Sequence, residues 1–218
     1  MTDLTAPGSA PDRFRETPGV PRQHRFGAVA EVTALSFLIG GFTAYAQGFL
    51  PEAIGPVANS ASGWTIVTVA LLWSVRARPP AAMVLGAVSF VLLTLGYTMA
   101  SGLRGHTYDP TLFGLVGVVA GPVVGLATAW LREQGLRAAL ATAVLSGIGI
   151  GEALYGLTVI ADSTSPVYWS IVGLGGAGLV GWTVLRRLHD SVSITLALGL
   201  TAVFAATFLV AYQRLGGF

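Results

Sequence analysis

Seven long apolar stretches follow one another along the chain, separated by short loops. They lie at residues 26–50, 61–75, 81–103, 111–131, 136–161, 167–185 and 191–213. A membrane-spanning helix needs about 20 mostly apolar residues, and five of the seven stretches exceed that length. Because backbone groups in hydrocarbon must pair within their own segment, these stretches predict helices rather than strands. The pattern therefore predicts an all-α polytopic transmembrane bundle of seven spans over residues 26–213.

The residues before the first stretch have a different composition. Residues 1–25 contain four prolines and four arginines among Gly, Ser and Thr. Such a segment buries too little apolar area to offset its ordering entropy, so we expect a disordered tail. Ala44-Tyr45-Ala46 has the form of a signal-peptide cleavage site. The apolar run before it is long and contains Glu31, which favours a retained first helix.

Composition supports a membrane location. The chain has 218 residues, of which 53% are hydrophobic and 10% are charged. A soluble particle of this size cannot hide so much apolar surface, so the expected partner is the lipid bilayer and not a nucleic acid. The absence of Cys excludes a disulfide scaffold and thiolate metal sites. The absence of Lys excludes a retinal Schiff base.

The arginines predict how the chain is threaded through the membrane. Ten of the twelve fall on one side of a seven-span arrangement, and only Arg104 and Arg214 fall on the other. Cytoplasmic loops carry an excess of positive charge, so we expect a cytoplasmic N-terminus and an external C-terminus. The ten are Arg13, Arg15, Arg22, Arg25, Arg76, Arg78, Arg132, Arg137, Arg186 and Arg187.

The second apolar stretch is too short for a full crossing. Its 15 residues span about 22 Å at 1.5 Å per residue, against a hydrocarbon thickness of about 30 Å. Either Asn59 or Ser60 caps this helix inside the outer leaflet, or the loop from Pro51 to Ser60 dips inward. A tilted edge helix is the alternative. Short interrupted helices often mark substrate sites, so we expect an outward-facing polar recess here.

Small residues recur at i, i+4 spacing on four of the stretches. Membrane helices associate through such residues, so the pattern predicts close packing within the bundle, with a sliding or dimer interface as the alternative. The predicted packing positions are Gly40, Ala44 and Gly48 in the first stretch, Gly117, Gly121 and Gly125 in the fourth, Gly147 and Gly151 in the fifth, and Gly173, Ala177 and Gly181 in the sixth.

Glu152 lies near the middle of the membrane in this arrangement, about 15 Å along the helix axis from Asp162. Intramembrane carboxyl groups are costly and usually face the bundle interior or a cavity, so Glu152 is a candidate for ligand binding or proton coupling. Tyr155, three residues further on, is positioned to offer it a hydroxyl. The alternative is a carboxyl group satisfied by interhelical hydrogen bonds that serves only packing.

Three short motifs carry a resemblance to a known family. They are Asn59-Ser60 with Trp64, Gly121-Pro122-x-x-Gly125, and Gly151-Glu152-Ala153-Leu154-Tyr155-Gly156. At these positions the chain resembles an uncharacterised family of small actinobacterial integral membrane proteins, which carries only a domain-of-unknown-function label. The resemblance implies a multi-pass protein of a bacterial plasma membrane. It implies no activity and no ligand.

The function that these features favour is a small permease or a substrate-binding membrane component. Its predicted recess involves Asn59, Ser60, Glu152 and Tyr155. The alternative is a non-catalytic subunit that docks a membrane protein, or a second copy of the chain, through its glycine stripes. The chain has no G-x-S-x-G, H-E-x-x-H or P-loop pattern, so we expect no enzyme. We likewise expect no metal and no cofactor.

Overall fold

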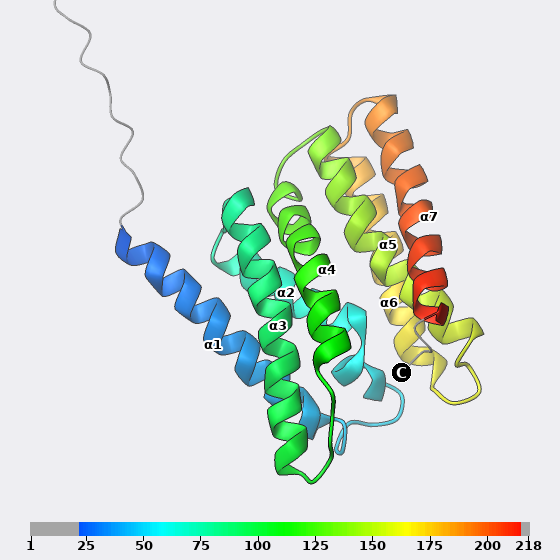
Figure 1. Ribbon diagram of the computed structural model, residues 1–218. Coiled ribbons are helices and arrows are strands. Elements are labelled where there is room, and N and C mark those ends of the chain that lie inside the picture. The colour runs from blue at the N-terminus through cyan, green and yellow to red at the C-terminus, as the bar shows by residue number, and fades with distance from the viewer. Residues whose placement is uncertain (1–21, 215–218) are drawn as a thin grey trace, which may run out of the picture.

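The computed structural model describes residues 22–214, and every regular element in that range is a helix (Figure 1). Six of these helices are long and apolar enough to cross a membrane, whereas α2 has only 14 residues. The predicted helical membrane bundle is confirmed. The elements are α1 (Arg22–Ala46), the 3-10 helix η1 (Gly55–Asn59), α2 (Ala61–Ser74), α3 (Pro79–Leu103), α4 (Thr111–Trp130), α5 (Leu136–Thr158), α6 (Pro166–Arg186) and α7 (Ser191–Arg214).

The first helix differs most from its predicted bounds. Helix α1 begins at Arg22, four residues earlier than predicted, and ends at Ala46. Irregular turns follow because Pro51 lacks an N–H and cannot continue a helix. Of the predicted tail, residues 1–21 lie outside the described residues. The other six predicted stretches agree with the helices to within three residues.

The helices form two groups of three with α2 between them (Figure 1). In one group α3 packs against α1 and α4, and in the other α5 packs against α6 and α7. The groups meet where α4 contacts α5, and α2 contacts α3, α4 and α5. The shortest helix therefore lies at the junction between the two groups.

The outer surface of the bundle is apolar, as a lipid environment requires. Phe42 on α1 is 69% exposed, and Leu174 and Leu185 on α6 are 73% and 81% exposed. Side chains of this kind face lipid at no cost, because hydrocarbon tails are as apolar as leucine.

The glycine stripe on α4 packs directly against α3. A Cβ atom added at Gly125 would lie 1.9 Å from the carbonyl oxygen of Ala82, and one at Gly121 would lie 2.6 Å from the Cα of Ala87. At Gly117 the added atom would lie 2.9 Å from the side chain of Phe90. No larger residue fits these positions, so the stripe allows the two backbones to approach closely.

Two glycines of α5 serve the second group in the same way. An added Cβ would lie 2.4 Å from the side chain of Phe204 at Gly147, and 2.7 Å from the carbonyl oxygen of Ala205 at Gly151. Both neighbours belong to α7. On α1, an added Cβ at Gly40 would lie 2.1 Å from the carbonyl oxygen of Leu93 on α3. The stripe on α5 and the Gly40 position on α1 are therefore occupied within the bundle, whereas the predicted packing position Gly48 lies beyond the end of α1 and is exposed.

The predicted stripe on α6 requires a correction. Gly173 approaches α5, but Ala177 is exposed and a Cβ at Gly181 would meet nothing within 4 Å. The contact is made instead by Gly176, where an added Cβ would lie 3.1 Å from the carbonyl oxygen of Ser146. The helix is rotated so that its buried side includes Val172, Gly176, Val180 and Thr183.

Arginines and tryptophans join three loops at the end of the bundle where α1 begins (Figure 1). The guanidinium of Arg132 lies 4.3 Å from the ring centroid of Trp73 and donates a hydrogen bond to the Trp73 carbonyl oxygen. Arg187 Nη1 donates to the carbonyl oxygen of Arg132 at 2.9 Å. The α2–α3, α4–α5 and α6–α7 connections thus share one arginine-rich face, as the positive-inside pattern predicts. Which side of the membrane this face occupies stays a prediction.

Candidate functional site

Helix α2 begins deep in the bundle, beside α5 and α6, and its first turn is capped by Ser60. The Ser60 Oγ accepts a hydrogen bond from the N–H of Gly63 at 2.9 Å and shares a second one with the hydroxyl of Tyr168 on α6. Ser60 is extended and buried. Of the two capping residues considered from sequence, Ser60 takes the role, and Asn59 is the exposed last residue of η1. The segment before Ser60 reaches α2 through this short 3-10 helix.

Glu152 caps the same turn from another helix. Its Oε1 accepts from the N–H of Ala61 at 2.7 Å, and its Oε2 accepts from the N–H of Ser62 at 2.6 Å. The first N–H groups of a helix have no partner within it, and the positive end of the helix dipole favours a carboxylate. Glu152 is 1% exposed, so a buried polar side chain satisfies buried backbone donors. The geometry gives Glu152 a structural role in holding α2 to α5.

Tyr155 does not take the position that its spacing from Glu152 suggested. Its ring lies edge-on to that of Tyr212 on α7, with the centroids 5.1 Å apart. Tyr155 is buried, and Tyr212 lines a cavity between α2, α4 and α7. Tyr155 therefore supports a cavity wall from behind, and the acceptors of Glu152 face the backbone of α2.

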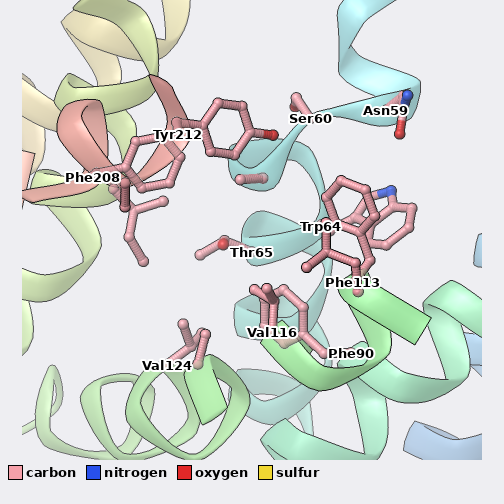
Figure 2. Close-up of a pocket in the computed structure, with 15 residues that line it drawn as sticks. Asn59, Ser60, Trp64, Thr65, Phe90, Phe113, Val116, Val124, Phe208 and Tyr212 are labelled. Atoms are coloured by element: carbon pink, nitrogen blue, oxygen red, sulfur yellow. The ribbon is translucent and has the colours of Figure 1, made fainter. Parts of the chain in front are cut away.

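A cavity of about 310 Å³ lies between α2, α4 and α7, and we call it the α2–α7 cavity. Figure 2 shows Asn59, Ser60 and Tyr212 along one side of it, and Phe90, Val116 and Val124 along the opposite side. The cavity thus has a polar rim and an apolar floor, and all of its lining residues are uncharged. They are Asn59, Ser60, Ala61, Trp64, Thr65, Phe90, Leu112, Phe113, Val116, Ala120, Val124, Ile148, Phe208, Ala211 and Tyr212.

A chain of aromatic rings supports one wall of this cavity. The centroids of Trp64 and Tyr97 lie 6.0 Å apart, those of Tyr97 and Tyr108 4.9 Å, and those of Tyr108 and Phe113 6.2 Å. The Tyr97 hydroxyl donates to Oε1 of Gln47 at 2.9 Å, which fixes the middle of the chain. Burial, with Tyr97 and Asp109 nearby, raises the pKa of Tyr108 to about 12, so its hydroxyl stays neutral.

Sequence reasoning missed most of these rings. Trp64 and Tyr212 fit an aromatic belt, but Tyr97 and Phe113 come from two further helices, α3 and α4, and no spacing in the sequence relates them. Phe208 lies four residues before Tyr212 on α7, and the two rings stack with their centroids 4.8 Å apart. A belt predicts the depth of aromatic residues, whereas only the fold brings them to one cavity.

A second cavity, of about 620 Å³, lies on the opposite side of α2 against α5 and α6, and we call it the α2–α6 cavity. It extends from Val57 and Tyr168 to Leu131, the residue before Arg132 of the arginine-rich face. Thr65 and Ile148 line both cavities. In place of the predicted polar recess, the structure has a pair of largely apolar cavities. The side-chain oxygens of Ser60 and Glu152 accept hydrogen bonds from the first turn of α2 instead.

Within residues 22–214, no group of three or more His, Asp or Glu side chains is arranged to hold a metal ion.

A family model described as a family of unknown function (DUF6518) matches residues 20–217. The chain belongs to this family. The match covers the whole bundle, and the family description assigns no activity. The comparisons with curated proteins and with solved structures find no match. The actinobacterial origin and the bacterial plasma membrane stay predictions.

Proposed function

We propose that this multi-pass membrane protein binds a small amphipathic molecule in the α2–α7 cavity, as a small permease or as the substrate-binding component of a membrane system. The observation that carries the proposal is the cavity itself, with uncharged walls, an apolar floor and a polar rim. Its volume falls in the lower range of small-molecule sites, which are mostly apolar with a few placed polar groups.

The position of the cavity supports entry from the lipid. It lies between α4 and α7, which belong to different helix groups and do not pack closely against each other. A molecule dissolved in the bilayer reaches such a site sideways, without crossing water. The apolar floor suits a hydrocarbon segment and disfavours an ion.

The second cavity supports transport in addition to binding. The α2–α6 cavity reaches toward the arginine-rich face, and Thr65 and Ile148 are common to both cavities. A shift of α2 against α5 that separates Thr65 from Ile148 would join the cavities into one path. That path is apolar, so the substrate class is amphipathic rather than ionic.

The test is photolabelling of the protein in lipid nanodiscs with a monoacylglycerol that carries a diazirine in its acyl chain. We expect labelled peptides from α4 and α7, around Val116 and Ala211. Ala120→Trp places an indole in the cavity and should reduce this labelling severalfold. The matched control is Val119→Trp on the same helix, because Val119 is 67% exposed and does not line the cavity. Equal labelling of wild type and Ala120→Trp would refute the proposal.

The alternative, a subunit that docks a partner through its glycine stripes, has less support. The stripes on α4 and α5 are already in contact with α3 and α7. Among the predicted packing glycines, Gly181 meets nothing within 4 Å, and one open position does not make an interface.

A further inference from the structure

Trp64 carries a buried hydrogen-bond donor that nothing in residues 22–214 satisfies. The residue is 6% exposed, and its Nε1–H has no hydrogen-bond partner among the described residues. Trp169 is equally buried, but its Nε1 donates to Oγ1 of Thr164 at 2.9 Å. Buried indole N–H groups normally find a partner, so an orphan donor in a cavity wall calls for an acceptor on a ligand.

The indole is held in place before any ligand arrives. Trp64 lies in the first turn of α2, which Ser60 and Glu152 anchor by three hydrogen bonds. Its ring packs against Tyr97, which is itself fixed by Gln47. Figure 2 shows the indole nitrogen turned toward the side on which Asn59 stands at the rim. A donor held in a fixed direction discriminates between ligands, because the indole loses little freedom of movement when the bond forms.

The charges around the cavity restrict the polar end of the ligand. No lining residue is cationic. An anionic end would therefore be buried without a counter-charge. An ammonium end offers only donors or methyl groups and leaves the Trp64 N–H unpaired. An uncharged acceptor such as an ester or amide carbonyl avoids both costs.

Resting on the function proposed above, we propose that the α2–α7 cavity selects an uncharged amphipathic molecule with a hydrogen-bond acceptor at its polar end, and that the Trp64 Nε1–H is the specificity-determining donor. The apolar part of the ligand lies along Phe90, Val124 and Phe208. The carboxamide of Asn59 at the rim is a second polar group within the same lining.

The experiment compares three photolabels with the same diazirine-bearing alkyl chain in nanodiscs. The first ends in a glyceryl ester, the second in a methyl group and the third in trimethylammonium. In wild type we expect the ester probe to label the cavity peptides most strongly. In Trp64→Phe, which keeps an aromatic ring without the N–H, its advantage over the methyl probe should fall about two- to tenfold, the range for one hydrogen bond.

Trp169→Phe is the matched control, because it removes an equally buried indole that has its own partner and lines neither cavity. It should leave the ester preference unchanged. If Trp64→Phe does not fold, the indole 15N–1H resonance of Trp64 in wild-type protein should shift with the ester probe and not with the methyl probe. The inference is overturned if ester and methyl probes label wild type equally, or if the trimethylammonium probe labels best. Absence of cavity labelling by every probe would instead refute the proposed function.

Discussion

At the scale of single residues, Glu152 and Ser60 determine where α2 can begin. Together they accept from three backbone N–H groups in the first turn of α2, with Glu152 reaching from α5. In a soluble protein water would satisfy these donors, but inside the bundle side chains must do so. Glu152 thereby links α5 to α2, and its replacement by Gln tests how much this link stabilises the bundle.

Glu152→Gln should destabilise the bundle even though the shape is kept. The amide retains one acceptor and presents an NH2 group to the other N–H, which then has no acceptor. We expect a loss of about 1–3 kcal/mol, the range for leaving a buried donor unsatisfied. Reversible unfolding in mixed detergent micelles measures it. Glu152→Ala should cost more, because two donors then lack acceptors.

The control for this prediction is Glu133→Gln. Glu133 forms an exposed ion pair with Arg137 at 2.7 Å, and its removal should cost no more than about 0.5 kcal/mol. A Glu152→Gln variant as stable as Glu133→Gln would show that the carboxylate does not hold α2.

At the scale of elements, the helices depend on caps in the loops and on glycines in the spans. Asp190 precedes α7, and its Oδ1 accepts from the N–H of Ser193 at 2.7 Å. This hydrogen bond holds the pKa of Asp190 below its usual range. A lowered pKa in the folded state stabilises the protein above the unfolded-state pKa of about 3.9, and this contribution is lost as the pH falls through the lowered value.

Asp190→Ala should therefore be less stable than wild type at neutral pH, and the difference should shrink as the pH falls below about 4. Thermal unfolding in detergent, followed by far-ultraviolet circular dichroism across pH, measures the difference. Asp190→Asn keeps a capping acceptor without a titrating group, so its deficit at neutral pH should be smaller. A gap between wild type and Asp190→Ala that is constant from pH 7 to about 3 would contradict the capping role.

The packing of α4 on α3 should not tolerate a single added methyl group. Gly125→Ala brings a Cβ to 1.9 Å from a backbone oxygen, and we expect a loss of about 1–3 kcal/mol from overpacking. Gly181→Ala, where a Cβ meets nothing within 4 Å, should be neutral or gain up to about 1 kcal/mol through helix propensity. Unfolding of the two variants in the same detergent compares them directly. Equal stabilities would mean that the α3–α4 contact is looser than a Cβ-to-oxygen distance of 1.9 Å requires.

Gly176 and Gly181 show what the sequence leaves open at this scale. Helix positions follow from hydropathy, because a stretch of about twenty apolar residues is typical of a membrane-spanning helix. The packed face of α6 does not follow, since lipid and bundle interior are equally apolar and glycines occur on several faces. The cap by Glu152 was also hidden, because its partners are backbone groups about ninety residues away. Ser60, by contrast, stands next to the helix it caps, and the sequence identified it as one of two candidates.

At the scale of the whole molecule, the arrangement of arginines predicts orientation. Three connections share one face through Trp73, Arg132 and Arg187, and α1 begins at the same end. Alkaline phosphatase fused after Phe218 should therefore be active, because it folds only outside the cytoplasm. A fusion after Gln134, in the loop between α4 and α5, should be inactive. Activity at Gln134 and not at Phe218 would contradict this arrangement, and it would mean either the reverse orientation or an even number of spans in which α2 does not cross.

The depth at which α2 begins also has a consequence for biosynthesis. Its 14 residues reach only about 21 Å, and two of its N–H donors find their acceptor on a residue translated 90 and 91 positions later. At about 5–20 residues per second, the ribosome needs roughly 5–18 seconds to deliver Glu152. An unsatisfied N–H in hydrocarbon costs several kcal/mol. During that interval, α2 is therefore not stable at the membrane depth that it occupies in the finished bundle. The order in which the helices are made is therefore not the order in which they reach their final places in the membrane.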